Sequence, residues 1–138
     1  MAMVAPFLLI ILLGIIEFGY IFGQYNEIRH SVREGARVAA VSNVALDQDG
    51  DSDFDEDDIE AYICSNLSLT TGAKTVTLTQ SGDDIGDTAT VTVSVVPQSL
   101  SSAPLISSFI PGTIDNTATF VLEQDATWNV PGASHTCP

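Results

Sequence analysis

Basic residues are scarce in this chain of 138 residues. It has four Lys and Arg residues against 18 Asp and Glu residues, which gives a formal net charge of −14. Such a surface repels the phosphate backbone of nucleic acids, so we expect no nucleic-acid partner. Half of the acids lie between residues 47 and 60. The rest of the chain is therefore poor in base rather than extreme in acid.

Residues that carry common enzyme chemistry are also few. The two histidines, His30 and His135, are isolated in the sequence, and no serine or cysteine lies in a nucleophile motif. The sequence contains no glycine-rich loop of the phosphate-binding type. We therefore expect that this protein is not an enzyme.

Only two cysteines occur, Cys64 and Cys137. Their separation is too large for a zinc knuckle or a CxxC redox motif. In an exported protein two cysteines usually form one disulfide. We predict a Cys64–Cys137 disulfide that ties the C-terminal tail to the middle of the chain; the alternative is two unpaired thiols.

The first segment is an almost unbroken apolar run. Residues 2–22 read AMVAPFLLIILLGIIEFGYIF and contain one ionisable residue, Glu17. This length is sufficient to cross a bilayer, and it exceeds the usual apolar stretch of a cleavable secretory signal. No positively charged stretch precedes the run. We expect a transmembrane helix in a mature chain whose charged leader has been removed; a truncated sequence would look the same.

The helical pattern continues beyond Phe22. Apolar residues recur at steps of three and four from Tyr25 to Ala39, which predicts an amphipathic continuation of the same helix. A basic stripe follows at Arg29, Arg33 and Arg37. Glu27 and Glu34 lie at helical spacing from this stripe, so ordinary surface ion pairs are an alternative to a binding role. A single helix over about residues 2–44 is typical of a pilin stem.

Two motifs on this helix carry a resemblance to a known family. GIIEFG (residues 14–19) followed by REGARVAA (residues 33–40) resembles the signature of TadE-like proteins, the pilin-like components of tight-adherence pilus systems. The resemblance implies a precursor in the inner membrane that a prepilin peptidase trims and the pilus assembly machinery uses. The leader glycine and the early glutamate usual in the family are not found here, and MAMVAP aligns best just after that glutamate. We expect that a few mature residues precede Met1.

Glu17 is unusual because a carboxylate within an apolar helix is costly unless it is paired or neutral. In a filament it would accept a bond from a neighbouring subunit's N-terminal amine or arginine stripe. The alternative is a protonated Glu17, or one that reaches water at the membrane edge. We expect the contacts between subunits at Leu9, Leu13, Gly14, Glu17, Phe18, Arg29 and Arg33.

The acidic segment DQDGDSDFDEDD (residues 47–58) resembles an EF-hand calcium loop. Alternating aspartates supply several hard oxygen ligands for one hard cation. Ser52 stands where the loop's glycine belongs, and the last ligand is an Asp instead of the longer Glu. We predict calcium as the ligand; the alternative is a solvated acidic loop. The expected ligands are Asp47, Asp49, Asp51, Asp53, Asp55 and Asp58.

The remaining chain predicts a small α+β head. Residues 57–67 carry apolar residues at four-residue steps, which indicates a second short helix. Three strand-like runs follow, at residues 74–80, 88–96 and 117–128. We expect a three-stranded antiparallel sheet whose apolar face packs on the amphipathic half of the first helix.

The predicted organisation is a transmembrane or filament-core helix over residues 1–45 and an extracellular head over residues 46–138. Within the head, residues 46–60 form the calcium-loop-like segment and residues 73–128 the sheet. The leading hypothesis is a structural subunit of an extracellular filament, a homo-oligomer joined by its N-terminal helices. Two alternatives remain: an inner-membrane assembly factor of the pilus system, and a membrane-tethered calcium-binding adhesive module.

Overall fold

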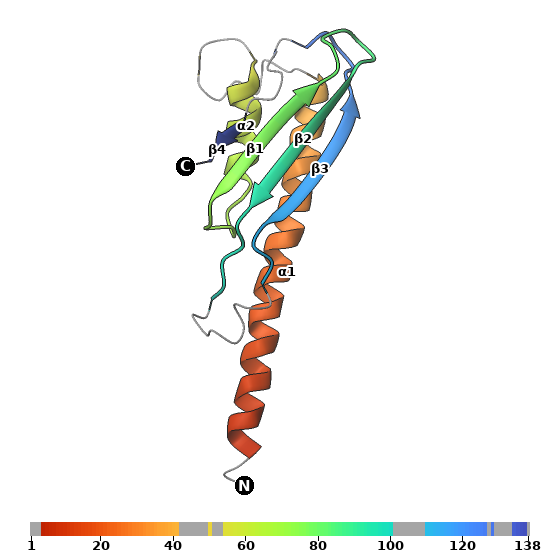
Figure 1. Ribbon diagram of the computed structural model, residues 1–138. Helices are drawn as coiled ribbons and strands as arrows, with labels where there is room; N and C mark the ends of the chain where they lie inside the picture. Colours follow the sequence, from red (N-terminus) through yellow and green to blue (C-terminus); the bar gives the residue numbers. More distant parts are fainter. Residues whose placement is uncertain are drawn as a thin grey trace.

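The protein consists of one long helix with a small α+β head on its C-terminal half (Figure 1). The computed structural model describes residues 4–41, 50, 54–100, 110–126, 128 and 134–137. We call the part of the chain from Phe54 onward the head. Helix α1 spans Val4–Val41, which corresponds to about 57 Å at about 1.5 Å per residue. Its N-terminal end projects away from the head (Figure 1).

The second helix, α2, spans Glu56–Ser65, close to the predicted range. Asp55 is its N-cap and accepts hydrogen bonds from the backbone N–H groups of Asp57 and Asp58, while the side chain of Asp58 accepts from the N–H of Asp55. This reciprocal capping box satisfies donors that a helix start leaves unpaired. Apolar residues at four-residue steps, Ile59 and Ile63, are fully buried against the core.

The strands form one antiparallel sheet in the order β3-β2-β1-β4. Strand β1 spans Lys74–Gln80, β2 spans Thr88–Val95, β3 spans Ile114–Val121 and β4 spans Ser134–Thr136. Alternation along β1 and β2 places valines and leucine in the core and threonines on the outer face. Two threonine pairs on that face, Thr90 with Thr119 and Thr92 with Thr117, share hydrogen bonds across β2 and β3.

The α+β class and the antiparallel sheet are confirmed, with two differences in the strands. The short strand β4 is a fourth strand that the sequence pattern did not reveal. The third predicted run, residues 117–128, is shifted: β3 begins at Ile114 and ends at Val121. The chain bends after β3, yet Trp128 still reaches the core, where its indole N–H donates to the carbonyl oxygen of Ala39 at 3.2 Å.

The core lies between the sheet, α2 and the C-terminal half of α1. Ile28, Val32 and Ala39 of α1 are fully buried, whereas the large apolar side chains of its first half are exposed. Gly35 lies at the contact between α1 and α2. A Cβ built there would come within 2.4 Å of the Ile63 side chain, so the absence of a side chain allows this close contact. The predicted packing of the sheet on the amphipathic half of the helix is therefore observed.

The predicted disulfide is present between Cys64 at the end of α2 and Cys137 directly after β4, with Cα atoms 5.6 Å apart. It closes a loop across 73 residues of sequence separation. The C-terminal segment is thus tied to α2, as the sequence predicted.

Candidate functional site

The first half of α1 lies outside the hydrophobic core. Leu9 is 58% exposed and Phe18 is 73% exposed. The same pattern holds for most large apolar side chains from Val4 to Phe22. This helix has the length and composition needed to cross a membrane, with a mean hydropathy of 2.3 over its most apolar window. Such a surface needs lipid or other apolar helices around it.

A row of polar residues follows the side of α1 that faces the head. We call it the polar ladder, and its steps of three and four residues place all members on one helix face. The polar ladder consists of Glu17, Tyr20, Gln24, Glu27 and Ser31. Each member forms a hydrogen bond with a loop of the head.

Two members of the ladder, Gln24 and Glu17, contact the segment after β2. Gln24 is fully buried and forms two hydrogen bonds with the backbone of Gln98: its Nε2 donates to the carbonyl oxygen at 2.9 Å, and its Oε1 accepts from the N–H at 3.2 Å. Two steps below, Glu17 Oε1 accepts from the N–H of Leu100 at 2.9 Å. Glu17 is only 3% exposed, although its helix neighbours are exposed. The carboxylate therefore interacts with the chain's own head.

Two other members, Glu27 and Tyr20, contact the loop between α2 and β1. Glu27 accepts from the N–H groups of Ser68 and Leu69, each at 2.8 Å, and from the hydroxyl of Thr70 at 3.1 Å. Tyr20 donates to the carbonyl oxygen of Leu69 at 3.1 Å. The bonds to the Glu27 carboxylate are charge-assisted, and such bonds are stronger than neutral ones. The ladder thus fixes the height of the head on α1 and leaves the turns below it uncovered.

The polar ladder was not predicted from the sequence. There Glu17 is expected to be a membrane carboxylate or a contact between subunits, and Glu27 a member of surface ion pairs. The available signal was the spacing of polar residues at positions 17, 20, 24, 27 and 31, which coincides with one face of a helix. What the spacing could not show was which loops of the head would meet that face.

The other residues expected at subunit contacts lie on the exposed side of α1. Leu9, Leu13 and Phe18 are exposed, and no atom of the described chain lies within 4 Å of a Cβ built on Gly14. Arg29 and Arg33 are exposed as well and line a shallow groove together with His30. Their role in contacts between subunits stays a prediction.

The basic stripe forms some local interactions. Arg37 pairs with Glu34 at 3.3 Å, as expected for ordinary surface pairs, and the guanidinium of Arg29 lies 5.7 Å from the centre of the Tyr25 ring. Exposed pairs of this type contribute only a few tenths of a kcal/mol. The stripe on the outer face of the helix is therefore not needed to hold the head.

The predicted calcium ligands fall partly outside the described residues. Asp47, Asp49, Asp51 and Asp53 lie there. Asp55 and Asp58, the two that the structure describes, form the capping box of α2. Both carboxylates thus have a structural role at the helix start, and calcium binding by the segment stays a prediction.

Comparison with known proteins gives a match at the N-terminal segment of the chain. The family model described as TadE-like protein matches residues 1–37. Over these residues the chain is similar to TadE-like proteins. This confirms the resemblance based on GIIEFG and REGARVAA and associates the chain with tight-adherence pilus systems. No curated protein and no solved structure gives a significant match.

The TadE-like segment ends inside α1 and covers the exposed apolar turns together with the whole polar ladder. A TadE-like segment and an apolar helix of this length fit a membrane-anchored, pilus-related protein. The head lies beyond the matched residues.

Proposed function

We propose that this protein is a structural subunit of an extracellular pilus-like filament, assembled through the exposed halves of its N-terminal helices. The observation that carries the proposal is the uncovered apolar surface from Val4 to Phe22, directly below a head that the polar ladder holds in place. A helix of this kind is stable in lipid. It can leave the bilayer if helices of other copies surround it and exclude water.

In the filament, Leu9, Leu13 and Phe18 supply apolar contacts between helices, and Gly14 allows close approach of two backbones. Arg29 and Arg33 face outward from the head and meet acidic surface on a neighbouring copy, as the net charge of −14 favours. Glu17 interacts with Leu100 within its own chain. In this proposal Glu17 fixes the head of its own subunit before any neighbour arrives.

The proposal includes a route to the surface. The precursor resides in the inner membrane, a prepilin peptidase trims it, and the pilus assembly machinery moves it into the filament. The chain acts as a building block and not as an enzyme. The disulfide between Cys64 and Cys137 agrees with an oxidising, extracytoplasmic location of the head.

A second candidate function is an inner-membrane assembly factor of the tight-adherence pilus. The observation that favours it is that α1 is long and apolar enough to span a bilayer as a single helix. Its head would then remain anchored outside the membrane. A tethered calcium-binding adhesive module is the third candidate, and it depends on the acidic segment alone.

Electron microscopy of filaments sheared from native cells into detergent-free buffer, with mass spectrometry of their subunits, separates the first two candidates. A thin filament with this chain as its main component supports the building block. If the chain stays in the membrane fraction and sheared filaments do not contain it, the assembly factor is the better account.

Calcium binding by residues 47–58 is a separate proposal, and it rests on the alternating aspartates. Calorimetric titration of the purified chain with Ca²⁺ tests it, with Asp49→Asn and Asp51→Asn as variants. We expect the variants to lose the binding heat. If calcium binding were the main function, filaments would still form from variants that do not bind calcium.

A further inference from the structure

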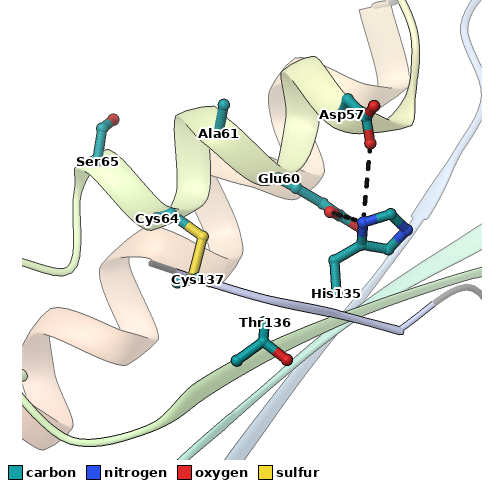
Figure 2. Close-up of a pocket in the computed structure, with 8 residues that line it drawn as sticks. All are labelled: Asp57, Glu60, Ala61, Cys64, Ser65, His135, Thr136 and Cys137. Atoms are coloured by element: carbon teal, nitrogen blue, oxygen red, sulfur yellow. Dashed lines mark ion pairs between the residues drawn. A yellow bond between two sulfur atoms is a disulfide. The ribbon is translucent and has the colours of Figure 1, made fainter.

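Two carboxylates and an imidazole converge on the outer side of α2 (Figure 2). Asp57 and Glu60 are three residues apart on α2, so they project from one helix face, and Cys64 lies one turn beyond Glu60. Along the C-terminal segment, His135 and Cys137 are two residues apart and project to the same side. Because the disulfide joins Cys64 to Cys137, it brings His135 opposite Asp57 and Glu60.

The distances between these three side chains are close to those between the ligands of one metal ion. His135 Nδ1 lies 2.8 Å from Glu60 Oε2 and 3.7 Å from Asp57 Oδ1. One ligand atom from each of the three residues lies within 4.8 Å of the others. Around a tetrahedral zinc ion, with bonds of about 2.0–2.1 Å, the ligand atoms are about 3.3 Å apart. Shifts of side chains alone would bring the three atoms to that spacing.

Glu60 provides an independent sign that a partner belongs here. Its side chain is buried, with the residue 6% exposed, and in the part of the chain that the structure describes no hydrogen-bond donor reaches its Oε1. Burial, followed by the negative charges of Asp57, Glu56 and Asp55, raises the pKa of Glu60 to about 8. An unpaired buried carboxylate oxygen is rare and costly, and a cation is the partner that would offset this cost.

We propose that Asp57, Glu60 and His135 bind a divalent transition-metal cation of the zinc class. Imidazole is a common ligand of zinc, whereas calcium takes oxygen ligands almost entirely. The site therefore differs in chemistry from the calcium loop predicted at residues 47–58. Asp57 and His135 are exposed at a pocket of about 530 Å³, so water can complete the coordination of the metal.

The metal would fasten the C-terminal segment to α2 next to the disulfide. Strand β4 has only three residues, and it pairs with β1 over three positions, Thr75–Thr136, Val76–His135 and Thr77–Ser134. So short a strand holds the segment weakly by itself. A metal bridge one helical turn from Cys64 gives β4 a second attachment to α2.

Calorimetric titration of the detergent-solubilised full chain with Zn²⁺, after removal of metals by a chelator, tests the proposal. We expect one zinc per chain at this site and no displacement of it by millimolar Ca²⁺. His135→Ala should weaken zinc binding at least tenfold, since it removes the only nitrogen ligand of the set. The matched control is His30→Ala, which removes the other histidine, an exposed residue of α1, and should bind zinc as the wild type does.

Asp57→Asn is the second variant, because this residue is exposed and its replacement leaves the core of the head unchanged. It should also weaken zinc binding while the circular dichroism spectrum stays that of the wild type. Absence of zinc binding by the wild type, full binding by both variants, or displacement by equimolar Ca²⁺ would overturn the proposal. None of these outcomes depends on filament formation, so the filament proposal can fail while this one holds.

Discussion

The two halves of α1 belong to one unbroken helix and one TadE-like match, yet their surroundings differ. The C-terminal half is buried by the sheet and α2, with Ile28 and Val32 fully covered. The N-terminal half remains exposed, apart from Glu17 and the ladder face above it. The head therefore sets the boundary between the halves: apolar packing buries the C-terminal half, and the polar ladder extends the contact down to Glu17.

The largest expected effect comes from removing the disulfide, which should destabilise the head and leave the first half of α1 unaffected. We expect the double variant Cys64→Ser/Cys137→Ser to lose about 2–4 kcal/mol of unfolding free energy, because the bond closes a long loop. Fluorescence of the single tryptophan, Trp128, reports unfolding of the head in denaturant. Membrane insertion of the first half should not change, as alkaline extraction would show. Release of the variant from membranes would contradict the independence of the two halves.

Two glycines, one in each half of α1, should respond differently to substitution by alanine. Gly35→Ala places a Cβ within 2.4 Å of Ile63 and should cost about 1–3 kcal/mol. Gly19→Ala meets no atom within 4 Å in the described chain and should leave the stability of the head unchanged or slightly raise it. Denaturant titration of both variants checks this. Equal destabilisation by the two changes would show that the halves are not packed as described.

Gln24→Ala tests the polar ladder at its most buried member. The change leaves the backbone N–H and C=O of Gln98 without their side-chain partners, so we expect a loss of about 1–2 kcal/mol. Asn26→Ala, at an exposed position two residues away, is the control and should change stability by less than about 0.5 kcal/mol. Hydrogen exchange of the Gln98 amide would rise in the first variant only. Unchanged exchange there would mean that the ladder does not hold this loop.

Much of this architecture follows from local sequence pattern. The alternating threonines and valines of β1 and β2, and the four-residue steps of Ile59 and Ile63, predicted elements close to those observed. Strand β4 could not be predicted in this way, because Ser-His-Thr has no apolar alternation and pairs with β1 only through long-range contacts.

The functional residues were harder to predict because they depend on tertiary register. Glu17 has a partner 83 positions further along the chain, and no local pattern indicates Leu100. The group of Asp57, Glu60 and His135 could have been found only in part from the predicted disulfide. Once Cys64 and Cys137 are joined, His135 must lie near α2, but whether it faces the turn before or after Cys64 depends on the direction of β4, which its pairing with β1 sets. In the sequence alone, His135 is an isolated histidine.

Photo-crosslinking in pilus-producing cells tests whether the exposed half of α1 joins subunits. A photoreactive amino acid is placed at Leu13, in the exposed half of α1, and in a second strain at Val32, under the head. We predict a series of crosslinked dimers and higher multimers of this chain from Leu13, and crosslinks only within the chain from Val32. Crosslinks from Leu13 to lipid alone, with no second copy attached, would contradict the account of the exposed half as the surface that joins subunits.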